Sequence, residues 1–181
     1  MNKLNFFLIA LMAWCIMPAD VTAQKITGLD ASPADIAYFR PGGRNADPLI
    51  KVIYSRPAKK GRTMLGGTEA YGKVWRTGAN ETTEIKLFKD VTFGDKLIKA
   101  GTYSLYSIPD KNEWTIIFNT KLDTWGAYAY DEKADIARIK VPAGKTDEEA
   151  EYFTIMFDGT GDKAVMILAW ENTLVKVPLK Y

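Results

Sequence analysis

Short runs of alternating apolar and polar residues follow one another from residue 49 to the end of the chain, separated by glycine, proline, asparagine and aspartate. Leu49 to Tyr54 is the first run, and Val165 to Trp170 is one of the last. Alternation with a period of two is typical of β-strands, and the intervening residues favour turns. Gly66-Gly67 interrupts the one helical candidate, Thr63 to Tyr71. The pattern predicts a mainly β fold, a single-domain antiparallel β-sandwich with about nine or ten strands and little helix.

Several of these expected strands are apolar on both faces. Trp114, Ile116 and Phe118 alternate with Ile117, so the second face of that strand also has to be shielded from water. The cover could come from a preceding segment, from a loop or from a second copy of the chain. The last case would make the protein a homodimer.

The first residues have the layout of a cleavable secretory signal. Lys3 precedes an apolar run from Phe6 to Met17, and the small residues of Val21-Thr22-Ala23 end the segment. The apolar run is shorter than the roughly 20 residues that a membrane-spanning helix needs. We therefore expect a signal peptide at residues 1–23 with no transmembrane segment after its removal, and an exported protein that is periplasmic or extracellular.

Two further segments follow the expected signal peptide. Residues 24–48 are rich in turn formers such as Arg40-Pro41-Gly42-Gly43, and they predict an irregular leader. Residues 49–181 form the expected β-sandwich domain.

Composition removes several kinds of chemistry. The chain has no histidine, so histidine-dependent nucleophiles and histidine-ligated metals are excluded. The single cysteine, Cys15, falls within the expected signal peptide, so the mature chain would have no disulfide. A net charge of +2 gives no indication of a nucleic-acid partner. We expect neither a cofactor nor a metal.

Polar and aromatic side chains concentrate between Tyr54 and Glu84. Guanidinium groups beside rings suit carboxylate or sugar ligands. Thr77 to Asn80 is turn-prone between two expected strands, so polar groups should meet at a strand end. There arginine would clamp the ligand, the amide and acid would bind hydroxyls, and the indole would stack. The candidate ligand-binding residues are Arg56, Arg62, Trp75, Arg76, Asn80 and Glu81.

Two alternatives stay open for this cluster. In the first it is structural, because charged groups that lose water must be paired whatever their role. In the second the protein is a carboxylate-dependent hydrolase of the glycosidase type. Glu81 and Glu84 are three apart, so an extended chain would point them to opposite faces, about 10 Å apart. Glu81 would then need Glu113 or Glu171 as its partner.

A second aromatic feature lies outside this cluster. Trp125-Gly126-Ala127-Tyr128 could present an aromatic platform to a sugar ring, or it could pack at a strand edge.

Several motifs resemble those of one sequence family. They are Tyr54-Ser55-Arg56-Pro57, Lys60-Gly61-Arg62, Tyr71 to Glu81, Ala100-Gly101-Thr102-Tyr103, Glu113-Trp114-Thr115 and Trp125-Gly126-Ala127-Tyr128. Together they resemble the bacterial exported family catalogued as domain of unknown function 2911. The resemblance covers about Ser32 to Pro178 and implies an exported bacterial protein. It implies no activity.

Overall fold

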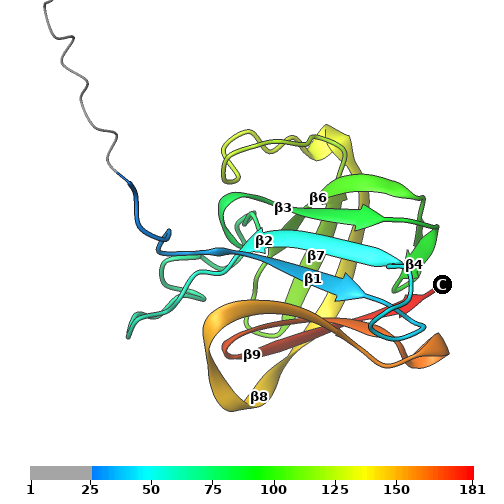
Figure 1. Cartoon of the computed structure of the whole chain (residues 1–181). Coiled ribbons are helices and arrows are strands. Elements are labelled where there is room, and N and C mark those ends of the chain that lie inside the picture. The colour runs from blue at the N-terminus through cyan, green and yellow to red at the C-terminus, as the bar shows by residue number, and fades with distance from the viewer. Residues whose placement is uncertain (1–25) are drawn as a thin grey trace, which may run out of the picture.

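The computed structural model describes residues 26–181, apart from the side chain of Asp162, and the expected signal peptide at residues 1–23 lies outside that range. Nine strands make up almost all of the regular structure (Figure 1). They are β1 (Ala34–Phe39), β2 (Ile50–Ser55), β3 (Ala79–Leu87), β4 (Val91–Phe93), β5 (Lys96–Ile98), β6 (Gly101–Ile108), β7 (Glu113–Asn119), β8 (Asp135–Asp158) and β9 (Val165–Lys180). The two short 3-10 helices are η1 (Glu132–Ala134) and η2 (Gly161–Lys163). The predicted mainly β class is confirmed.

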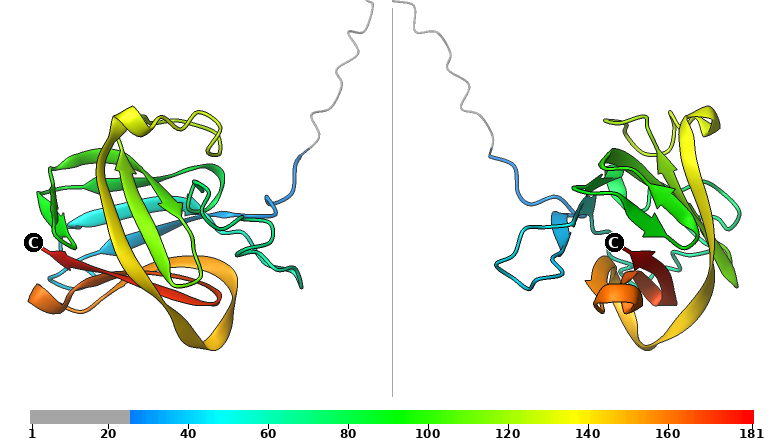
Figure 2. Two further views of the ribbon diagram at one scale, coloured as in Figure 1. Left: turned by 180° about the vertical axis from the view of Figure 1, so that it is seen from behind. Right: turned by 90° about the vertical axis from the view of Figure 1, so that its right-hand side faces the viewer.

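The strands join into one continuous antiparallel sheet in the order β1-β2-β3-β6-β7-β8-β9-β4-β5. β8 is 24 residues long; its first part pairs with β7 and its second part with β9. Between these two parts the strand turns sharply and carries the sheet round a corner (Figure 2). The topology gives one curled sheet, and it does not show the two separate sheets of a sandwich.

Backbone hydrogen bonds join the segment that follows β2 to the second part of β8. The backbone N–H of Phe153 donates to the carbonyl of Pro57, and the N–H of Lys59 donates to the carbonyl of Glu151. Ala58 and Tyr152 form an isolated antiparallel bridge between these bonds. The end of β2 is therefore held against the second part of β8, which encloses the core on this side.

The concave face of the sheet encloses the hydrophobic core. Every second residue of β2 and β3 points into it, including Val52 and Ile85, which are fully buried. Trp75 and Trp170 stack near its centre with ring centroids 5.5 Å apart and an interplanar angle of 13°. Apolar burial of this kind is the main stabilising contribution in a domain without disulfides.

A loop of the chain itself covers part of the opposite, convex face. Tyr106 of β6 and Ile117 of β7 point to that face and are buried. The loop at residues 120–131 lies over them, and the Tyr130 ring packs edge-on against Tyr106 with centroids 5.0 Å apart. The second apolar face of β6 and β7 is therefore shielded within one chain. A homodimer stays a prediction, and this face does not require it.

The segment before residue 49 differs from the expected irregular leader. Ala34–Phe39 forms β1 and pairs along its whole length with β2. The alternation in this strand is weak because Ala34 and Ala37 are small and Asp35 is polar. Pairing with the stronger strand β2 decides its conformation.

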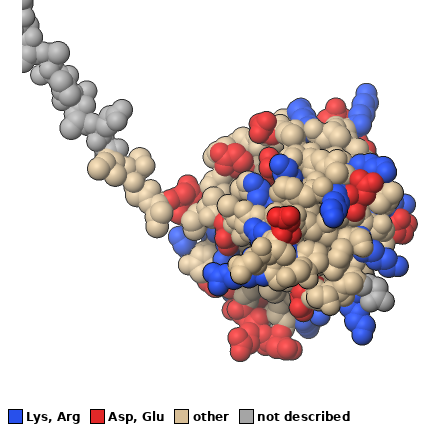
Figure 3. Space-filling model, turned by 45° about the vertical axis from the view of Figure 1, so that its right-hand side comes forward, with Lys and Arg blue, Asp and Glu red and all other residues tan. Residues whose placement is uncertain are grey.

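Basic and acidic side chains are interspersed over most of the face in Figure 3, and a group of acidic side chains lies at its lower edge. In the described part of the chain, no helix is long and apolar enough to cross a membrane.

Candidate functional site

Arg56 ties the end of β2 to β8. Its guanidinium donates to the carbonyl of Phe153 at 3.2 Å, to the hydroxyl of Thr154 at 2.7 Å and to the carboxylate of Asp35 at 3.0 Å. These three bonds use one N–H each of Nε, Nη1 and Nη2. The predicted role of Arg56 as a ligand clamp therefore finds no support in this geometry, which gives it a structural role.

Arg62 and Trp75 are also engaged within the protein. Arg62 donates to the carbonyls of Lys59 and Ala58, at 3.0 and 2.9 Å, and so closes its own loop. Trp75 is only 3% exposed, and its indole N–H donates to the carbonyl of Gly78 at 3.0 Å. The Trp75 ring has no free face on which a sugar could stack, because it packs in the core.

Arg76 and Asn80 are partly exposed. A Cβ atom on Gly126 would lie 3.2 Å from Nη1 of Arg76 and 2.9 Å from the Tyr128 ring, so both side chains crowd that glycine. The Nε of Arg76 is buried and has no hydrogen-bond partner in the part of the chain that the structure describes. The amide of Asn80 donates to Asp30 at 3.0 Å.

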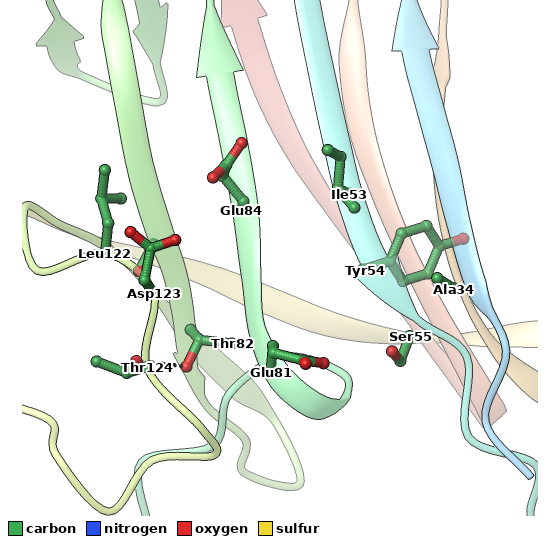
Figure 4. Close-up of a pocket in the computed structure, with 11 residues that line it drawn as sticks. Ala34, Ile53, Tyr54, Ser55, Glu81, Thr82, Glu84, Leu122, Asp123 and Thr124 are labelled. Carbon is green, nitrogen blue, oxygen red and sulfur yellow. Dashed lines mark hydrogen bonds between the residues drawn. The ribbon is translucent and has the colours of Figure 1, made fainter. Parts of the chain in front are cut away.

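Glu81 lines a hollow of about 220 Å³ on the convex face, at the end of β2 and the start of β3 (Figure 4). Of the six predicted site residues, it is the one that lines this hollow. The eleven lining residues are Ala34, Ile53, Tyr54, Ser55, Glu81, Thr82, Glu84, Ser104, Leu122, Asp123 and Thr124.

The register of the sheet builds one wall of the hollow. Ile53, Glu84 and Ser104 are direct partners across β2, β3 and β6, so their side chains point to the same face. The next pair between β2 and β3 is Ser55 with Ala79, so residues 80–83 lie opposite Tyr54 alone. This bulge releases the start of β3 from the regular sheet.

The released segment pairs with the loop at residues 120–131 instead. The N–H of Thr82 donates to the carbonyl of Thr124, the N–H of Gly126 donates to the carbonyl of Asn80, and Glu81 forms an antiparallel bridge with Trp125. The loop and the bulge together form the second wall of the hollow.

The bulge also overturns one expectation. Glu81 and Glu84 were expected to point to opposite faces because they are three apart in an extended segment. They line the same hollow, since Asn80 has a left-handed φ of +58° and the strand is irregular between Asn80 and Thr83.

A network of hydroxyl groups fixes the floor of the hollow. The Thr124 hydroxyl lies 2.8 Å from the Thr82 hydroxyl and 2.9 Å from the Tyr106 hydroxyl, and Thr82 also donates to the carbonyl of Gly126 at 2.6 Å. Ser104 donates to the carbonyl of Lys121 at 2.7 Å. These bonds hold the loop on the sheet and give the hollow a defined shape without a ligand.

The carboxylates around the hollow, unlike these hydroxyl groups, have no bonding partner among the described residues. Among the described residues, Glu81, Glu84 and Asp123 form no ion pair, and their carboxylates accept no hydrogen bond. No group of three or more acidic or cysteine side chains in the described part of the chain is arranged to hold a metal ion. The three carboxylates are spread around a hollow, and they present free acceptors to it.

Ser55 adds a fourth group with spare capacity. The residue is only 8% exposed, and its hydroxyl forms no hydrogen bond with any residue that the structure describes. In Figure 4 this hydroxyl and the Glu81 carboxylate point toward one another across the lower part of the hollow. Its oxygen is not among the fully buried atoms that lack a partner, so it is accessible from the hollow to a ligand group or a water.

An exposed tryptophan stands beside the hollow. Residues that pair in an antiparallel bridge have their side chains on one face, so the Trp125 indole lies on the same side as the Glu81 carboxylate. Trp125 is 59% exposed, and Tyr128 is 87% exposed three residues later. Trp125 does not line the hollow itself, but it follows the lining residue Thr124 and pairs with the lining residue Glu81, so the predicted aromatic platform is exposed next to the hollow.

The two acids suggested as partners of Glu81 in a hydrolase lie elsewhere. Glu113 pairs with Lys140 at 3.0 Å. Glu171 accepts hydrogen bonds from the backbone N–H groups of Met64 and Leu65, at 2.8 and 3.0 Å. Neither lines the hollow, whose other acids are Glu84 and Asp123.

Ser55, Glu84 and Asp123 were not among the predicted site residues. Ser55 and Glu84 belong to the polar segment that the sequence analysis singled out, whereas Asp123 lies far from it along the chain. Its one local signal is its place in a polar loop just before Trp125.

These features define a small antiparallel β domain with an acidic, aromatic-rimmed hollow on its convex face. Residues 32–179 match the family described as "Protein of unknown function (DUF2911)", and the chain belongs to that family. No curated protein and no solved structure matches the chain.

Proposed function

We propose that this protein is a binding domain for a small sugar, or for one sugar unit of a longer chain, at the hollow beside Trp125. The observation that carries the proposal is the pairing of Trp125 with Glu81: an exposed indole and a free carboxylate share one face at the rim of a formed hollow. A sugar ring offers an apolar face to the indole and hydroxyl donors to the carboxylates.

The size of the hollow is consistent with this ligand class. Drug-sized ligands occupy pockets of about 300–1,000 Å³, and the hollow measures about 220 Å³. One sugar unit would occupy it, while further units would extend over the exposed rim.

The amino-terminal pattern supports a place for this binding outside the cytoplasm. A domain exported to the periplasm or the cell surface would meet the sugars of the envelope and of the surroundings. Export is tested separately, by mass spectrometry of the amino terminus of the mature protein, which should begin at Gln24.

The binding test is a calorimetric titration with a panel of mono- and oligosaccharides. Trp125→Ala should abolish binding while the melting temperature stays unchanged, because its indole is largely in water. Leu97→Ala is the matched control, since Leu97 is also 59% exposed but lies on β5, away from the hollow. Binding that survives Trp125→Ala at full strength would refute this site.

A second candidate function is glycoside hydrolysis, favoured by the presence of Glu81, Glu84 and Asp123 around one hollow. Hydrolases of this kind use two carboxylates, one as general acid and one as base or nucleophile. Glu81→Gln should then remove turnover of a bound oligosaccharide without removing binding. Binding without any turnover by the unaltered protein would leave the binding function alone.

A further inference from the structure

The charges around the hollow narrow the class of sugar, and this step rests on the proposed function. We infer that the preferred ligand is an amino sugar whose protonated amine lies among Glu81, Glu84 and Asp123. The argument has three parts: the charge of the lining, the kind of hydrogen-bonding capacity left free, and the neighbouring indole.

The first part is the charge of the lining. Three of the eleven lining residues are acidic, and none is basic. Arg56, which follows the lining residue Ser55 in the sequence, donates to β8 and Asp35, as described above. The lysine that follows Glu84 on the same face, Lys86, has its Nζ 5.0 Å from the centre of the Phe88 ring. A carboxylate or phosphate ligand would meet only like charge here, whereas an ammonium group would be attracted by the acids of the lining.

The second part is the match of donors to acceptors. An ionised carboxylate only accepts hydrogen bonds, so a ligand that binds at Glu81, Glu84 and Asp123 has to supply donors in place of water. A protonated amine supplies three donors and no acceptor. Ser55, nine-tenths buried and without a partner among the described residues, supplies one further hydroxyl in the same hollow, which can bind a ring hydroxyl of the sugar.

The third part is the indole at the rim. A cation near the face of a tryptophan is attracted by the ring, and the apolar face of a sugar packs against it. Trp125 shares its face with Glu81, so one sugar unit can contact the indole and direct its amine to the acids. A free diamine or a simple ammonium ion would pair with the acids, but it has no sugar ring to pack on the indole and no ring hydroxyl to bond to Ser55.

The test compares sugars that differ only at the amine. The glucosamine disaccharide, its N-acetylated form, the neutral glucose disaccharide and a galacturonate disaccharide are titrated calorimetrically into the full chain, at a pH where the free amine is protonated. The amine form should bind about tenfold or more tightly than the acetylated form, which corresponds to about 1.4 kcal/mol. That preference should shrink as salt is added.

Two isosteric variants locate the effect. Glu84→Gln and Asp123→Asn should each reduce the preference for the amine, and asparagine tolerates the left-handed φ of +56° at position 123. Glu148→Gln is the control for unspecific attraction, because Glu148 is an exposed acid in β8 that does not line the hollow. An equal loss in the Glu148 variant would assign the preference to general surface charge and overturn the inference.

The outcomes separate this inference from the proposed function. Equal affinity for the amine, acetylated and neutral sugars, lost in Trp125→Ala, would overturn the amino-sugar inference and leave sugar binding in place. Tightest binding of the galacturonate sugar would overturn it too. No binding of any sugar would refute the proposed function itself.

Discussion

The polar groups of the arginine-rich segment at residues 56–76 and those of the acidic hollow differ in whether they have partners within the protein. Arg56 has three partners on other strands, and Arg62 has two on its own loop. Glu81, Glu84 and Asp123 have no partner among the described residues. A group already bonded within the protein stabilises the fold, whereas a group left free in a hollow is available to a ligand.

The difference teaches that residue type does not decide which groups are free. Arginine, amide and tryptophan look like ligand-binding residues in the sequence, and most of them hold the structure together. Phe153 and Thr154, which bind Arg56, are 97 and 98 residues away along the chain. Only the folded topology shows that the two positions meet.

The largest expected effect separates two tryptophans. Trp75→Ala should lower the free energy of unfolding by about 3–5 kcal/mol, because it leaves a cavity beside Trp170, Trp114 and Phe153. Trp125→Ala should change it by less than about 0.5 kcal/mol. Urea unfolding followed by circular dichroism measures both. Similar losses in the two variants would contradict the distinction between a core indole and a surface indole.

The next effect separates two glutamates. Glu171→Ala leaves the N–H groups of Met64 and Leu65 without their acceptor, so it should cost about 2–3 kcal/mol. Glu84→Ala should cost less than about 0.5 kcal/mol, because its carboxylate has no partner in the described chain. The same unfolding experiment measures both. A costly Glu84 variant would mean that Glu84 stabilises the fold.

Much of the fold follows from local pattern, because alternation and turn residues act over a few positions. The runs Leu49 to Tyr54, Trp114 to Phe118 and Val165 to Trp170 were predicted as strands, and they correspond to β2, β7 and the first part of β9. β1 was expected to be irregular, since its pairing with β2 and not its own pattern decides it. The single continuous sheet depends on the switch of β8 from β7 to β9 at Pro142 and Ala143, and local pattern does not decide these long-range pairings.

Less of the candidate site could be predicted, because it depends on a bulge and on a long-range contact. Glu81 and the Trp125 platform were found because acid and aromatic side chains in turn-prone segments are visible in a sequence. Glu84 was assigned to the opposite face because a bulge, unlike a regular strand, breaks the alternation. Asp123 reaches the hollow only because the loop pairs with the released start of β3, a long-range contact.

A smaller effect sharpens the role of Arg56. Arg56→Lys keeps the charge but cannot reproduce the fork that reaches Asp35, Thr154 and the Phe153 carbonyl at once. It should cost about 1 kcal/mol in urea unfolding, since the side chain is partly exposed. Sugar affinity in calorimetry should stay unchanged. A loss of affinity at full stability would return Arg56 to the binding site.

The smallest expected effect concerns Glu69, an acid of the arginine-rich segment that is mostly buried. Burial raises the pKa of the Glu69 carboxyl above its ordinary 4.5, and the charge of Arg76 offsets part of this. The folded protein therefore binds this proton more tightly than the unfolded chain does. Stability from this group is full below pH 4.5 and falls as the pH rises through the raised pKa.

Glu69→Gln removes that loss, because the amide does not ionise. Relative to the unaltered protein, the variant should gain stability between acidic and neutral pH, by about 0.5 kcal/mol or less. Urea unfolding of both proteins at a pH below 4.5 and again at pH 7 shows how the difference in their free energies of unfolding changes with pH. Glu84→Gln is the matched control in the hollow. A Glu69 variant that loses stability on going to neutral pH would mean that Arg76 holds the ionised acid in place, and that this part of the segment is an ion pair after all.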